Sequence, residues 1–197
     1  MKILNFENFI KESAGQPFRY RSENKPINWG KDDPMTKNAE ERKMRIVFRR
    51  ELSNVKKILD MLIKYDLKYF TFSIDDYVEV EYIGNNQIAV NDTKYTYTGK
   101  INELEHAFTI DNFFEPENID LDNLWYVYPT YIFSINGINN QTNYSEYLKN
   151  TIKQLSYKYE NEYVDDEDYD RPTCFVDNVD DFIKDFQKVF EKEIRRY

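Results

Sequence analysis

Cysteine, histidine and glycine are scarce in this sequence, and each scarcity excludes a class of site. The single cysteine, Cys174, excludes an internal disulfide and is typical of a reducing compartment or of a particle assembled in the cytoplasm. The single histidine, His106, excludes a metal centre built from several histidines. It could meet Cys174 as a catalytic pair only through the fold. Five glycines are too few for a phosphate-binding loop, so the sequence predicts a protein that is not an enzyme and takes no cofactor.

Long apolar runs are also missing, so neither a secretory signal nor a membrane span is expected. The net charge of -9 disfavours non-specific binding of nucleic acid by the whole surface. Residues 1–70 hold 16 Lys and Arg against 10 Asp and Glu, whereas residues 71–197 hold 11 against 26. This uneven charge favours head-to-tail self-association of a basic pole with an acidic pole. The alternative is two solvated surfaces that have no partner.

Residues Leu67 to Ile110 carry the residue patterns of several short β-strands joined by tight turns. Aromatic and β-branched residues dominate its start, and residues 77–83 alternate between apolar residues and glutamates, as in a half-buried strand. Gly84-Asn85-Asn86 suits a hairpin turn, and short strands are expected at 87–91 and 95–98. Connections this short join antiparallel neighbours. Residues 101–110 fit either a strand or a short helix.

Helical patterns surround this block. Residues 37–66 carry the longest apolar stripe: Met44, Phe48, Leu52, Val55, Leu59 and Leu62. A second helix is expected at 144–159, and a third runs to the C-terminus from a cap at Asp177 or Asn178. The aromatic run 124–135 contains Trp125 and Pro129, and the proline predicts an edge strand or two strands broken at a bulge.

These patterns predict an α+β fold in which an antiparallel sheet of about four to six strands is covered by about three main helices in a single domain. Residues 1–36 are expected to form a short helix, with Phe6, Phe9 and Ile10 on one side, and an extended arm that contains Trp29. Residues 37–197 form the α+β body. Trp29 pins the arm to the core or binds a partner.

Two charge clusters are candidate sites. Arg42, Lys43, Arg45, Arg49 and Arg50 form the only basic patch that we identify in the sequence. They contact phosphate or an acidic neighbour, or else form a solvated face paired with nearby glutamates. Residues 160–170 hold seven acidic residues without the glycine and ligand spacing of an EF-hand. A solvated loop is favoured there, with a weak Ca²⁺ or Mg²⁺ site as the alternative, and no metal ligands are assigned.

The start of the chain resembles the beginnings of many tailed-bacteriophage proteins: Met-Lys is followed by Phe-x-x-Phe-Ile-x-Glu. In T4-like phages a similar leader directs internal proteins to the prohead, where a protease cuts after a hydrophobic-x-Glu triplet. Ile10-Lys11-Glu12 matches that triplet. The composition, with 17 tyrosines and 14 phenylalanines, resembles virion proteins of crAss-like gut phages. An AT-rich genome accounts for such a composition, as does a tyrosine-rich interface.

The resemblance implies a non-enzymatic virion component: a head–tail connector, a tail-ring protein or an internal head protein assembled in the host cytoplasm. The expected partners are other virion proteins or copies of the chain itself, without direct nucleic-acid contact. Interface candidates are Phe6, Phe9, Ile10, Trp29, Arg45, Arg49, Arg50 and Trp125. The alternative is a small acidic phage inhibitor of a host enzyme or defence system, and a metal-assisted hydrolase using the 160–170 acids ranks last.

Overall fold

The structure is a computed structural model that describes residues 34–75, 78–109, 129–139, 144–160 and 172–196. The chain divides into two units, residues 1–38 and 39–197, and every strand of the described residues lies in the second. The elements in chain order are α2 (Pro34–Lys64), β1 (Phe70–Ile74), β2 (Val78–Gly84), β3 (Gln87–Val90), β4 (Thr93–Thr96), α3 (Ile101–Leu104), β5 (Tyr131–Ser134), a 3-10 turn (Ile135–Gly137), α4 (Ser145–Ser156), β6 (Thr173–Val176) and α5 (Val179–Ile194).

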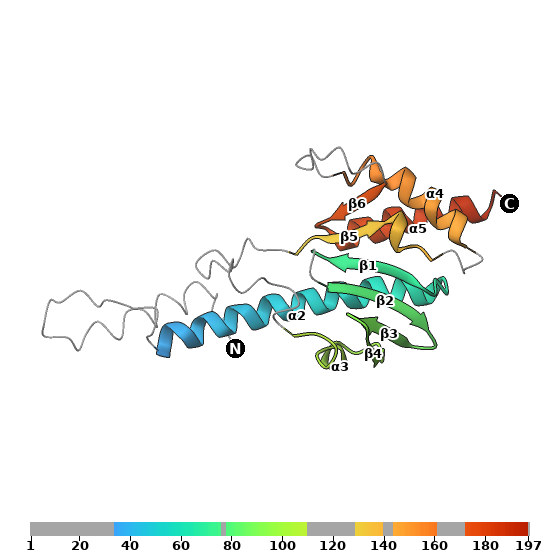
Figure 1. Ribbon diagram of the computed structural model, residues 1–197. Coiled ribbons are helices and arrows are strands. Elements are labelled where there is room, and N and C mark those ends of the chain that lie inside the picture. The colour runs from blue at the N-terminus through green and yellow to red at the C-terminus, as the bar shows by residue number, and fades with distance from the viewer. Residues whose placement is uncertain (1–33, 76–77, 110–128, 140–143, 161–171, 197) are drawn as a thin grey trace, which may run out of the picture. The chain divides into compact units, whose positions relative to one another are not determined.

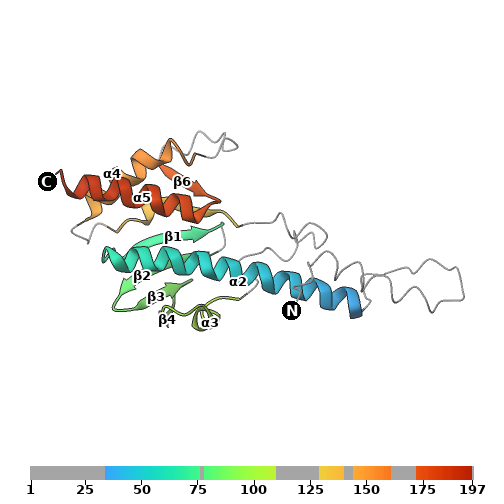
Figure 2. The same cartoon turned by 180° about the vertical axis from the view of Figure 1, so that it is seen from behind.

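The six strands form one sheet in the order β4-β3-β2-β1-β5-β6, and every neighbouring pair is antiparallel. Figure 1 shows the strands side by side, and Figure 2 shows α2 and α5 in front of the same face of the sheet. The third main helix, α4, lies beside the outer strand β6 and against α5 (Figure 1). The predicted α+β class, with its antiparallel sheet and three main helices, is confirmed.

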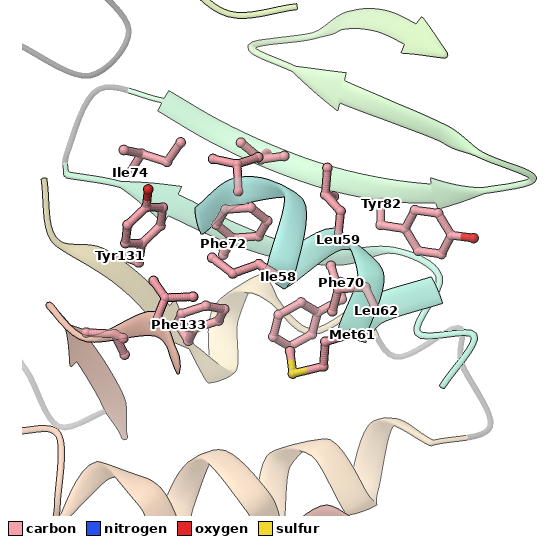
Figure 3. Close-up of a cluster of buried hydrophobic side chains, with 14 of the residues drawn as sticks. Ile58, Leu59, Met61, Leu62, Phe70, Phe72, Ile74, Tyr82, Tyr131 and Phe133 are labelled. Carbon is pink, nitrogen blue, oxygen red and sulfur yellow. The ribbon is translucent and has the colours of Figure 1, made fainter. Parts of the chain in front are cut away.

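Alternation along the strands decides which face the helices cover. Val78, Val80 and Tyr82 of β2 are buried, whereas Glu79 between them is exposed, as the sequence pattern predicted. Residues on the buried face of β1, β2, β3, β5 and β6 meet the apolar stripes of α2 and α5, as Figure 3 shows for part of the core. The opposite face carries the polar residues of β1, β2 and β3.

Helix α2 begins three residues earlier than predicted, at Pro34 rather than at residue 37. The prediction treated Pro34 as part of a loop, but proline suits the first turn of a helix because the amide hydrogen it lacks has no partner there. Of the predicted stripe, the residues from Phe48 to Leu62 are buried and Met44 is half-buried. The stripe is therefore confirmed over the part of α2 that faces the sheet.

Three strand predictions need correction. Strand β4 begins at Thr93, two residues before the predicted start, because Asn91 and Asp92 both adopt positive φ and close a two-residue hairpin turn. Strand β5 is an interior strand between β1 and β6, not an edge strand, since pairing begins at Tyr131, after Pro129. Strand β6 was not predicted at all, although Thr173–Val176 is a short run of strand-favouring residues.

Helices α4 and α5 are tied together by a charged hydrogen-bond group. The hydroxyl of Tyr159, just after α4, donates to the Asp185 carboxylate on α5 at 2.6 Å, and Lys158 pairs with the same carboxylate. These bonds from Lys158 and Tyr159 hold the pKa of Asp185 below its usual range. The Asp185 side chain is 30% exposed, so solvent screens part of this interaction.

Asp185 should therefore contribute stability that depends on pH. A carboxyl whose pKa is lower in the folded state stabilises the fold above its unfolded pKa of about 3.9, and this contribution is lost as pH falls through the folded pKa. We expect Asp185→Asn to be less stable than the parent at pH 6, with the difference shrinking as the pH falls below about 4. Urea unfolding across this range measures it. Asp92→Asn, which changes an exposed carboxylate without an ion pair among the described residues, is the control, and a difference independent of pH would contradict the assignment.

Candidate interaction surface on helix α2

Four residues of α2 form an exposed stripe that we call the basic stripe: Arg42, Arg45, Ile46 and Arg49. Their spacing of three, four and seven residues places them on one face of the helix. Ile46 is 58% exposed, which makes it one of the few large apolar side chains on the described surface that faces water. The stripe thus presents one aliphatic side chain flanked by three guanidinium groups.

Within the described part of the chain, none of these three arginines has an acidic side chain at ion-pair distance. Among the residues of α2 whose side chains the structure describes, the first in an ion pair is Arg50, with Glu51. Like charges three and four residues apart repel each other by about 0.2–0.5 kcal/mol per pair on a helix. The arrangement is therefore slightly unfavourable for the isolated helix and becomes favourable when an acidic surface covers it.

Arg50, which was predicted as an interface residue together with Arg45 and Arg49, lies outside the basic stripe. Arg50 Nε donates to Glu51 Oε1 at 2.6 Å, and Asn54 Nδ2 and the Tyr131 hydroxyl donate to Glu51 Oε2 at 3.0 Å and 2.9 Å. The Glu51 side chain is only 2% exposed, whereas that of Arg50 is 37% exposed. Arg50 thus joins a buried network between α2 and β5. The structure brings Arg45 and Arg49 together in the stripe and directs Arg50 to this network.

The remaining interface candidates, Phe6, Phe9, Ile10, Trp29 and Trp125, lie outside the described residues, as do residues 161–171 of the acidic tract. The Cys174–His106 pair is not formed. Cys174 faces the core on β6, where burial raises the pKa of its thiol to about 12 and the Sγ donates to the Ile152 carbonyl at 3.7 Å. His106 is exposed just after α3, at the other end of the sheet (Figure 1).

Sequence reasoning missed an acidic hollow on the face of β2 and β3 that lies opposite α2. Its volume is about 160 Å³, and its lining residues are Glu79, Glu81, Ala89, Asn91 and Asp92. We call this the acidic face. The sequence placed Glu79 and Glu81 on the solvent side of a strand, but only the register of β2 with β3 brings them next to residues 89–92.

The basic patch on α2 is not the only one, which corrects the prediction from the sequence. Four cations at the C-terminal end of α5, together with Glu191, line an open hollow of about 440 Å³: Lys188, Lys192, Arg195 and Arg196. Their spacing of four, seven and eight residues is the signal that could have revealed it. Arg195 pairs with Glu191 and Arg196 with Glu193, so this patch is partly neutralised by its own helix. The basic stripe of α2 is the stronger candidate because, among the residues that the structure describes, its arginines have no such pairs.

No group of three or more metal-ligating side chains occurs among the residues that the structure describes. The described helices include none with the length and apolarity needed to cross a membrane. Comparison with protein-family models, with curated proteins and with solved structures found no match to this chain. The surface chemistry of the described residues is therefore the basis for a functional proposal.

Proposed function

We propose that this protein acts by assembly with another protein, with the basic stripe of α2 as its docking surface. The observation that carries the proposal is Ile46, 58% exposed and flanked by Arg42, Arg45 and Arg49 without acidic partners among the described residues. The setting that we propose is a bacteriophage particle, in which the chain is a non-enzymatic structural component. The resemblance of residues 1–13 to phage leaders supports that setting.

The composition of the stripe, an exposed aliphatic side chain among arginines, is typical of the centre of a protein interface. Arginine is enriched at protein interfaces, and energetically important contacts usually join an apolar anchor to charged groups that become desolvated on binding. The three guanidinium groups require an acidic partner surface. A protein surface suits them better than nucleic acid, because residues 71–197 contribute 26 acidic against 11 basic residues and repel a phosphate backbone at long range.

A second candidate function is inhibition of a host enzyme or defence system by mimicry of nucleic acid. The acidic face of β2 and β3 favours it, since Glu79, Glu81 and Asp92 present three carboxylates around one hollow. In that case the partner would bind through the acidic face and would be insensitive to changes in the basic stripe. The two functions therefore differ in which surface a partner covers.

A photo-crosslinking amino acid placed at position 46 tests the docking surface directly. We expect it to form adducts with an acidic segment of a protein partner in the cell in which the chain naturally occurs. Adding Arg45→Glu and Arg49→Glu should abolish these adducts because the variant repels the same carboxylates. Melting should stay within about 0.5 kcal/mol of the parent, since both side chains are exposed.

Lys153→Glu with Lys192→Glu is the matched control, because it reverses the same number of charges at exposed positions on α4 and α5. Adducts at position 46 should survive in this control. If reversal of Arg45 and Arg49 leaves the adducts unchanged, the basic stripe is not the docking surface. If Glu79→Gln with Glu81→Gln removes a partner that the stripe variant retains, inhibition through the acidic face is the better account.

A further inference from the structure

We infer that the partner of the basic stripe is a second copy of this chain, which receives it on the acidic face of β2 and β3. This inference rests on the proposed function and names its partner. The sequence already divides the chain into a basic part and an acidic part. The structure adds two particular surfaces of opposite charge.

Two hydrogen bonds tie the turn beside the acidic face to β2, and its carboxylates have no ion pair among the described residues. Asn91 N donates to the Glu79 carbonyl and Glu79 N donates to Asn91 Oδ1, both at 3.1 Å, so the turn at residues 91–92 is fixed against β2. Glu79 and Glu81 lie two residues apart on one strand and therefore on one face. In the described part of the chain no cation lies at ion-pair distance from Glu79, Glu81 or Asp92.

The two surfaces also match in number and size. Three carboxylates surround Ala89, and three guanidinium groups surround Ile46. The small side chain of Ala89 leaves a hollow of about 160 Å³ between them. An engineered cavity of about 150 Å³ holds a benzene molecule, so the hollow has room for one aliphatic side chain. Ile46 of one copy fits the hollow of the next while its arginines meet the carboxylates.

The contact must form between two copies. In β2 the buried core residues alternate with Glu79 and Glu81, which therefore lie on the opposite face of the sheet. Figure 2 shows α2 in front of the sheet, so the sheet separates the acidic face of a chain from its own α2. In the contact that we infer, the stripe of each copy occupies the acidic face of the next copy, which is a head-to-tail, heterologous arrangement. A heterologous contact repeats from copy to copy and gives a closed ring or an open filament. This is the symmetry that a ring or connector component needs.

Sedimentation velocity of the purified full chain, over a range of concentrations, tests the inference. The parent should associate beyond a dimer at low salt and dissociate in 1 M NaCl, where the Debye length falls to about 3 Å. Arg42→Gln/Arg45→Gln/Arg49→Gln and Glu79→Gln/Glu81→Gln should each be monomeric, with association weakened by about tenfold or more. Unchanged melting shows that both variants fold.

Mixing the triple arginine variant with the double glutamate variant tests whether the two surfaces bind each other. Each retains one intact surface, so the mixture should form a one-to-one dimer and nothing larger, because the remaining surfaces have lost their charges. An isologous pair, in which each copy's stripe occupies the other copy's acidic face, would instead stop at a dimer in the parent and would overturn the head-to-tail arrangement. Lys153→Gln/Lys192→Gln should associate like the parent.

If the parent stays monomeric at every concentration, or if either variant associates like the parent, the inference is overturned. The proposed function fails separately, when the position-46 adducts with any protein survive reversal of Arg45 and Arg49. A monomeric parent whose adducts are lost on that reversal overturns self-association and leaves docking on a different acidic protein.

Discussion

Phe133→Ala is expected to lower the free energy of unfolding by about 3–5 kcal/mol, the range for truncation of a fully buried phenylalanine. Phe133 is 0% exposed and joins the sheet to α5. Its ring centroid lies 4.4 Å from that of Phe182 and 5.6 Å from that of Phe72, and both pairs are stacked. Phe70 lies 6.0 Å away (Figure 3). Removing the ring leaves a cavity among three aromatic side chains that backbone pairing on both sides of β5 keeps from closing.

Ile132→Ala is the matched control because it changes the neighbouring residue of the same strand on the other face of the sheet. Ile132 is half-buried, so its truncation should cost about 1 kcal/mol. Equilibrium urea unfolding of the parent and both variants measures the difference in unfolding free energy. The comparison is valid when the slope of unfolding free energy against urea concentration is the same in all three proteins. Equal losses in the two variants would mean that the aromatic cluster is not the centre of the core.

The helices and the central hairpin could be predicted from the sequence because their signals are local. The apolar stripes of α2 and α5 repeat at helical spacing, and Asn178 caps α5 by accepting from Asp181 N at 3.2 Å. The turn at Gly84-Asn85-Asn86 adopts positive φ throughout, which the residue types anticipated. In these segments neighbouring residues alone determine the conformation.

The position of β5 inside the sheet and the formation of β6 depend on hydrogen bonding between segments that are far apart in the chain. Local residue patterns do not reveal such pairing. Thr173–Val176 is only four residues long, and it becomes a strand because β5 offers a partner. The acidic face has the same origin, since the register of β2 with β3 sets Ala89 beside Glu81. The sequence prediction named Arg42, Arg45 and Arg49 within a larger patch that also held Lys43 and Arg50, because all five are cations on one helix. Ile46 was missed because one apolar residue on a charged face has no periodicity.

The buried network around Glu51 was likewise hidden from the sequence, which assigned Arg50 to an interface. The structure buries the Glu51 carboxylate and gives it three donors, from Arg50, Asn54 and Tyr131. Burial and the neighbouring Glu51 raise the pKa of the Tyr131 hydroxyl, so this group remains a donor at neutral pH. The network connects the middle of α2 to an interior strand.

Glu51→Ala is therefore expected to lower the free energy of unfolding by about 2–4 kcal/mol. The variant removes the acceptor of three donors, and the Tyr131 side chain is 0% exposed, so water cannot replace the lost partner without opening the core. This loss of unfolding free energy is smaller than the loss expected on breaking a fully buried ion pair, because Arg50 is 37% exposed and water can solvate its guanidinium group in the variant. Ser53→Ala, two residues along α2, has no side-chain hydrogen bond among those of the described residues and should cost less than about 0.5 kcal/mol.

A double-mutant cycle with Tyr131→Phe separates the hydrogen bond from the rest of the network. Tyr131→Phe alone should cost about 1–3 kcal/mol, because it leaves a buried carboxylate with one donor fewer. Once Glu51 is alanine, the same change should cost much less, since the hydroxyl has already lost the buried carboxylate and retains weaker neutral partners such as the Glu51 carbonyl at 3.3 Å. We expect a coupling free energy of about 1 kcal/mol or more between the two sites. Strictly additive losses in urea unfolding would show that Tyr131 and Glu51 contribute independently and that the carboxylate is held by Arg50 and Asn54 alone.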